Sequence, residues 1–212
     1  KRIEAAGGID LFIGGGTRFF MERRDGRNLA EELKAKGFTV ATDMAELDGV
    51  TEGKVAALLA PNAMPTIGQG RSKDYLPGAT AKALEILSNN SKKGFFVMIE
   101  GSQIDGEAHA NNIEGVVAEI VDFDAAVKIA FDYADKHPGT LVVVTADHET
   151  GGTSVSYKSY PVNQPEGMQL SFSTKGHSGT VVPIFAYGAG AKNFAGIFQN
   201  KEIPGIIEEL IK

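Results

Sequence analysis

Cysteine is absent from the 212-residue sequence, which excludes disulfide bonds and thiolate ligands, so any metal ion must be held by histidine, aspartate or glutamate. The sequence also lacks the run of about 20 apolar residues that a membrane-spanning helix needs, so we expect no membrane partner. Positive charge is not in excess either. The formal net charge of −6 argues against a nucleic-acid partner, and it disfavours an anionic substrate unless bound cations reverse the local field.

The beginning of the sequence has neither an initiator methionine nor the charged-then-apolar pattern of a signal peptide. Residues 1–8 are instead typical of the end of a helix, followed by a glycine stop and a strand. We therefore expect this chain to be the C-terminal part of a longer protein, with a fold that is incomplete at the N-terminus.

Short apolar runs followed by turn residues predict buried strands, and apolar residues at three- and four-residue steps between them predict helices. The expected strands are residues 9–13, 38–41, 55–59, 94–99, 141–145 and 181–186, and the expected helices are residues 29–36, 80–87, 113–136 and 203–211. This alternation predicts an α/β fold with a mainly parallel sheet and helices on both faces. We expect a single domain over residues 1–212, with residues 149–176 forming a small insertion or loop region.

Ligands of parallel sheets bind beyond the carboxyl ends of the strands, where this sequence places acidic and histidine residues. Asp105 and His109 follow the run 94–99 and are four residues apart, so one helical turn would place both on one side, suited to a shared zinc ion. Glu100 stands directly after the same run, and its hard oxygen suits magnesium.

Two further segments carry histidine. Asp147 and His148 follow the run 141–145 and can converge on one ion only if the strand ends there, while His177 precedes the run 181–186. Together the predicted site holds three carboxylates and three histidines at one sheet edge. The predicted site would place three negative charges close together, those of Glu100, Asp105 and Asp147. These carboxylates would repel one another, and bound cations are the simplest way to neutralise that repulsion.

Each residue taken alone also has an ordinary structural interpretation. Asp105 could cap a helix, Glu100 could pair with a lysine, and His177 could be a surface loop residue. His137 ends a predicted helix and is interpreted as complementing the helix dipole. The three glycines at 14–16 lack the Lys and Ser/Thr of a phosphate-binding loop, so they predict a turn.

Several segments of the sequence match a known family in the same order. Residues 99–112, 144–152 and 176–188 resemble the metal-binding segments of alkaline phosphatases, and residues 12–16 and 25–29 resemble the stretch that precedes them. The resemblance implies that Asp105, His109 and His177 bind one zinc ion, Asp147 and His148 bind a second, and Glu100 binds magnesium. It also implies hydrolysis of phosphate monoesters through a phosphoserine intermediate, a homodimer, and a periplasmic or secreted location.

The chain departs from the family in lacking its serine nucleophile segment. Ser102 occupies a small-residue position of a metal segment and Ser178 has no support as a nucleophile, so we expect no catalytic nucleophile here and an inactive fragment. We also expect bared apolar surface and self-association. Two alternatives stay open: a sulfatase-like or phosphoglycerate-mutase-like metalloenzyme, and a non-catalytic metal-binding module.

Overall fold

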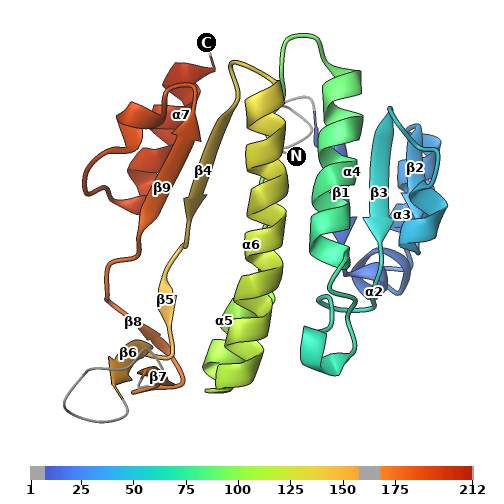
Figure 1. The fold of residues 1–212 in the computed structure, drawn as a ribbon. Helices are drawn as coiled ribbons and strands as arrows, with labels where there is room; N and C mark the ends of the chain where they lie inside the picture. Colours follow the sequence, from blue (N-terminus) through green and yellow to red (C-terminus); the bar gives the residue numbers. More distant parts are fainter. Residues whose placement is uncertain (1–7, 158–167, 212) are drawn as a thin grey trace. The chain divides into compact units, whose positions relative to one another are not determined.

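The computed structural model describes residues 8–157 and 168–211, and the chain divides into two compact units, Lys1–Gly101 and Ser102–Lys212 (Figure 1). Each unit is described by itself. The prediction of one domain over residues 1–212 stays a prediction, and the helix end predicted at the start of the chain falls mainly on residues 1–7, outside the described residues. None of the described helices combines the length and the apolar character that crossing a bilayer requires.

The first unit is built on a parallel three-stranded sheet in the order β1-β3-β2 (Figure 1). Its elements are β1 (Leu11–Gly14), α2 (Thr17–Met21), α3 (Leu29–Ala35), β2 (Phe38–Ala41), β3 (Lys54–Leu58), α4 (Tyr75–Asn90) and two 3₁₀ turns, Met44–Leu47 and Ile67–Gln69. Val55 and Ala57 of β3 are fully buried and pack with Ile86 of α4. The alternation of side chains along β3 therefore directs these two residues toward α4, which confirms the α/β prediction.

The second unit joins α-helices to antiparallel strand pairs. Its elements are α5 (Gln103–His109), α6 (Ile113–Lys136), β4 (Leu141–Thr145), β5 (Glu149–Thr150), β6 (Ser154–Tyr157), β7 (Met168–Ser171), β8 (His177–Ser178), β9 (Ile184–Gly188), α7 (Ile203–Leu210) and two 3₁₀ turns, Ala191–Phe194 and Asn200–Glu202. The pairs are β4 with β9, β5 with β8 and β6 with β7. Tyr187 of β9 fixes this strand to α6, because its hydroxyl donates to Asp135 at 2.5 Å.

Two predicted strands differ from the structure. Residues 94–99 form no strand with any part of the described chain, because an apolar run becomes a strand only where a neighbouring backbone offers hydrogen bonds. The predicted strand 181–186 begins later, at Ile184, directly after Pro183, which has no N–H to donate to a ladder. The region 149–176, predicted as an insertion or loop, includes β5, β6 and β7, and its residues 158–167 lie outside the described residues.

Candidate metal centre

α5 places Asp105 and His109 on the same side of one short helix, as their four-residue spacing predicts. Asp105 lies in the first turn and His109 is the last residue. His109 Nε2 is 3.4 Å from Asp105 Oδ2, and both side chains are partly open to solvent. A carboxylate oxygen and an imidazole nitrogen therefore lie close enough to bind the same metal ion.

The pairing of β5 with β8 brings the third member of the group from 68 residues further along the chain. Thr150 stands opposite His177 in the ladder. His177 Nε2 is 3.2 Å from His109 Nε2 and 3.6 Å from Asp105 Oδ1. One ligand atom from each of Asp105, His109 and His177 lies within 4.8 Å of the others, as a shared cation requires.

The hydrogen bond made by one ring nitrogen of His109 leaves the other ring nitrogen free to bind a metal ion. Its Nδ1 lies 2.6 Å from the backbone carbonyl oxygen of Lys175. Because a carbonyl oxygen only accepts, Nδ1 carries the proton, and the lone pair of Nε2 points toward Asp105 and His177. Metal-binding histidines commonly donate their other N–H in this way. Two imidazole nitrogens and one carboxylate form a donor set that suits zinc.

Asp147 and His148 form a second group beside the first. β4 ends at Thr145 and the chain bends at both residues, so the condition that the strand must end there is met. His148 Nε2 lies 3.3 Å from Asp147 Oδ2. The ring of His148 stacks on that of His177, with 3.7 Å between the ring centroids. Five of the six residues that the sequence selected therefore lie together in the second unit.

Glu149 holds the β5–β8 pair together, a role that the sequence did not predict. Its carboxylate accepts a hydrogen bond from the hydroxyl of Ser178 and from the backbone N–H groups of Gly152 at 3.1 Å and Thr153 at 2.6 Å. The hydrogen bond from Ser178 is the main cause that lowers the pKa of Glu149 below its ordinary value. The hydroxyl of Ser178 thus donates a hydrogen bond to the Glu149 carboxylate, and its surroundings are not those of a nucleophilic serine.

Thr150 is the other residue that sequence reasoning missed. The residue is 9% exposed, and its hydroxyl lies between Asp105 and His148. Neither a periodicity nor a residue-type pattern distinguishes this threonine, because its partners become neighbours only when β5 approaches α5.

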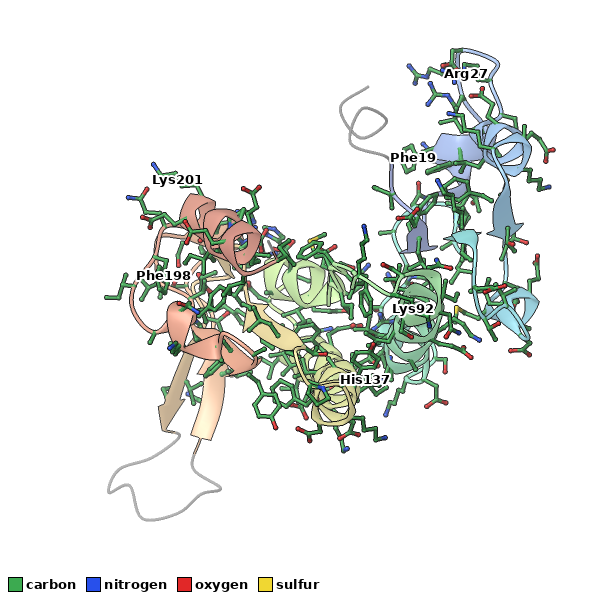
Figure 2. The ribbon with its side chains drawn as sticks, turned by 90° about the horizontal axis from the view of Figure 1, so that it is seen from above. Phe19, Arg27, Lys92, His137, Phe198 and Lys201 are labelled. Atoms are coloured by element: carbon green, nitrogen blue, oxygen red, sulfur yellow. The ribbon has the colours of Figure 1, made fainter. Side chains whose placement is uncertain are left out.

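Three further residues that the sequence singled out are Glu100, Ser102 and His137. Glu100 is exposed and belongs to the first unit, so its role as a magnesium ligand stays a prediction. Ser102 occupies the N-cap position of α5 without a capping hydrogen bond from its side chain. His137 ends α6 (Figure 2), where its ring stacks on Tyr133 and its Nδ1 lies 2.8 Å from the Tyr133 carbonyl oxygen, in keeping with a helix-end role.

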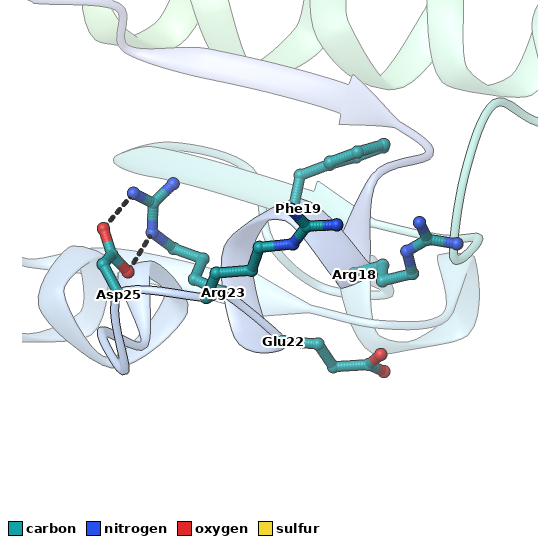
Figure 3. Close-up of a pocket in the computed structure, with 6 residues that line it drawn as sticks. Arg18, Phe19, Glu22, Arg23 and Asp25 are labelled. Atoms are coloured by element: carbon teal, nitrogen blue, oxygen red, sulfur yellow. Dashed lines mark hydrogen bonds and ion pairs between the residues drawn. The ribbon is translucent and has the colours of Figure 1, made fainter.

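The first unit has a surface hollow of about 540 Å³ beside α2 (Figure 3). Its lining consists of Arg18, Phe19, Glu22, Arg23, Arg24 and Asp25, with Arg23 paired to Asp25. None of the predicted metal ligands lines it, so it forms no part of the candidate metal centre.

Comparison with known proteins gives one consistent result. Residues 1–169 match the alkaline phosphatase family. The chain is 30% identical to alkaline phosphatase 4 of Bacillus subtilis, over 96% of this chain and 58% of that protein. It is also 30% identical to the alkaline phosphatase of Escherichia coli, over 92% of this chain and 50% of that protein.

Solved structures agree with the sequence comparison. The alkaline phosphatase from the Antarctic bacterium TAB5 matches with a TM-score of 0.87 and 41% identity, over 96% of this chain and 60% of that one. A mutant of the TAB5 enzyme has been solved with Mg bound in its M3 site. This chain spans between 50% and 60% of the length of these relatives. Since the sequence and fold similarities each extend over more than nine-tenths of its residues, the chain belongs to the alkaline phosphatase family.

Proposed function

We propose that the protein containing this chain hydrolyses phosphate monoesters with two zinc ions, one magnesium ion and a phosphoserine intermediate. The convergence of Asp105, His109 and His177 is the observation that carries the proposal, because it joins α5 to a strand far along the chain. These three residues would hold the first zinc ion. Asp147 and His148 would contribute to the second site, and Glu100 to the magnesium site.

The chemistry of such a site follows from its charges. When bound, a pair of metal ions stabilises the negative charge on the entering and leaving oxygens of phosphoryl transfer. The residues of this chain supply the matching geometry: the Lys175 carbonyl orients the His109 ring, and the β5–β8 pair places His177. Bound cations would also offset the net charge of −6, which otherwise disfavours an anionic substrate.

The 212-residue chain by itself should be inactive. A phosphoserine intermediate needs an activated serine, and neither serine near the metal segments has the surroundings of one. Ser178 donates to Glu149, and Ser102 stands at the start of α5. We therefore assign the chain most of the metal ligands but no nucleophile. From the family we further propose a homodimeric parent enzyme in the periplasm or outside the cell.

Turnover of p-nitrophenyl phosphate by the full-length protein, with zinc and magnesium added at alkaline pH, tests the parent activity. We expect His177→Ala to lower kcat/KM at least about a hundredfold, since a bound metal lowers the barrier by several kcal/mol and its loss removes this stabilisation of the transition state. His137→Ala is the matched control and should retain activity. Equal activity in both variants would contradict the metal centre, and faster hydrolysis of p-nitrophenyl sulfate would favour the sulfatase-like alternative.

The 212-residue chain is assayed in the same way, in a preparation from a host without alkaline phosphatase. We expect no turnover above that of buffer with the metals. Robust turnover that His177→Ala abolishes would show that the chain does contain a nucleophile, and would overturn its assignment as inactive.

A further inference from the structure

One hydroxyl group connects the two groups of predicted metal ligands. Thr150 Oγ1 lies 2.6 Å from Asp105 Oδ1 and 3.2 Å from His148 Nδ1. Asp105 belongs to the predicted first zinc site and His148 to the second. The proposed function assigns no role to Thr150 itself.

The direction of the two hydrogen bonds follows from the number of available protons. A threonine hydroxyl has one proton and two lone pairs, and an ionised carboxylate only accepts. The hydroxyl therefore donates to Asp105, and a lone pair of Oγ1 accepts from His148. This arrangement requires the proton of a neutral His148 ring to be on Nδ1, which leaves the lone pair of Nε2 available.

The position of the hydroxyl is itself well fixed. Thr150 pairs with His177 in the β5–β8 ladder, which fixes its backbone. A β-branched side chain in a strand has few accessible χ1 rotamers. The ladder that brings His177 to the site therefore also sets the Thr150 hydroxyl between Asp105 and His148.

We propose that Thr150 is a positioning residue that serves both predicted zinc sites at once. It orients the carboxylate of Asp105, and it holds His148 in the tautomer whose Nε2 can bind a metal ion. The consequence for metal affinity rests on the proposed function. The tautomer of His148 does not, because it is a property of the chain without metal.

The first experiment measures the tautomer of His148 by ¹⁵N NMR in the metal-free chain, at a pH high enough to keep the ring neutral. We expect the Nδ1–H form to dominate in the wild type and in Thr150→Ser, which keeps a hydroxyl. In Thr150→Val, which keeps the shape but has no hydroxyl, the Nε2–H form should become substantial. An unchanged tautomer in Thr150→Val would overturn the proposal.

Thr153→Val is the matched control, because it removes a hydroxyl of the same turn, one that contacts the Thr150 backbone carbonyl and the Glu149 carboxylate but forms no hydrogen bond with Asp105 or His148. The tautomer of His148 should be unchanged in this variant. A change as large as that in Thr150→Val would show that any hydroxyl loss loosens the turn, and would overturn the specific role of Thr150. If Thr150→Val does not fold, as judged by its NMR spectrum, Thr150→Ala replaces it in the same comparison.

The second experiment measures zinc affinity by competition with a chromophoric chelator. Loss of a residue that orients metal ligands typically weakens binding about 10- to 100-fold, and we expect this range for Thr150→Val. Thr150→Ser should lie within a few-fold of the wild type, and Thr153→Val should match it. Equal affinity in Thr150→Val and the wild type would overturn the role of Thr150 in metal binding.

The two experiments separate failure of this inference from failure of the proposed function. If the wild type bound zinc no better than His177→Ala, the proposed metal centre would be wrong, together with the effect of Thr150 on affinity. The tautomer measurement would still decide whether Thr150 controls the ring of His148.

Discussion

At the scale of single residues, the three clustered histidines are oriented by different contacts. His109 is held by the Lys175 carbonyl, His148 contacts the Thr150 hydroxyl, and His177 lies between the other two rings. Each contact leaves a ring nitrogen facing the predicted ligands. Metal affinity should therefore depend on residues that themselves bind no metal.

The surface carboxylate Asp25 offers a test of electrostatics outside the metal centre. The hydrogen bond from Arg23 is the main cause that lowers the pKa of Asp25 from 3.8 to about 2. Since the folded pKa lies below the ordinary value, the stabilisation by this pair is complete above pH 3.8 and is lost as the pH falls through about 2. Titration of the carboxyl ¹³C resonance should give a midpoint near 2.

Arg23→Gln should move that midpoint back toward 3.8, because it replaces the charged guanidinium that donates to both Asp25 oxygens with a shorter, neutral amide. Arg24→Gln is the control. Arg24 lines the same hollow but is not among the groups that shift Asp25, so the midpoint should stay in place. A midpoint at the ordinary value in the wild type would contradict the ion pair.

The residues of the candidate metal centre could be selected from the sequence because spacing and residue type carry the signal. Asp105 and His109 are linked by the helical period, and Asp147 and His148 lie at a bend directly after an apolar run, where a strand is expected to end. The roles of Thr150 and Lys175 could not be predicted, because their partners lie 45 and 66 residues away and no local pattern encodes such contacts. One of them acts through a backbone atom, which every residue type possesses.

At the scale of elements, Gly15 and Gly16 form the turn that the sequence predicts at residues 14–16, between the end of β1 at Gly14 and the start of α2. The turn lies against the segment that follows β3: the N–H of Gly16 donates to the carbonyl of Ala60 at 2.7 Å. A Cβ on Gly15 would overlap the backbone of Asn62 and stand 3.0 Å from the carbonyl carbon of Ala63. Only a residue without a side chain fits there.

Gly15→Ala should therefore destabilise the chain by about 1–3 kcal/mol, the usual cost of overpacking against atoms that cannot move aside. Gly14→Ala is the matched control, since its Cβ would have no neighbour within 4 Å and its φ is not in the left-handed region. Urea unfolding followed by circular dichroism measures both variants. Equal midpoints for the two variants would contradict the close approach.

Prediction of whole elements succeeded where local signals define both ends. α6 has the predicted bounds, because Asn112 caps its start by accepting from the N–H of Gly115, and a Pro-Gly pair follows His137. Prediction failed for residues 94–99. The apolar run predicts a strand, but the structure has neither a strand nor a helix there. A strand also needs a partner, and a sequence window does not contain one.

At the scale of the whole molecule, α6 leaves an apolar stripe exposed. The stripe consists of Ile113, Val117, Ile120 and Val121, which are between 42% and 63% exposed. Their spacing of three and four residues places them on one face of the helix. An apolar stripe of this kind favours association with another surface.

We therefore expect the chain to self-associate as its concentration rises, measured by light scattering after size-exclusion chromatography. Val117→Glu should weaken association about tenfold or more, because burying a charge in place of a valine costs more than the apolar contact that is lost. Gln169→Glu adds the same charge at an exposed position of β7 and should have no such effect. A wild type that stays monomeric at high concentration would contradict the expectation.

The two-residue ladder between β5 and β8 has a consequence for how this part of the protein can vary in evolution. Because Thr150 and His177 face each other across it, the chain leaves and returns at neighbouring points. Lengthening a loop whose ends are already held together costs little, only about 0.6 kcal/mol for each doubling of its length. Relatives could therefore carry inserted segments of very different size between these strands while the imidazole of His177 keeps its place.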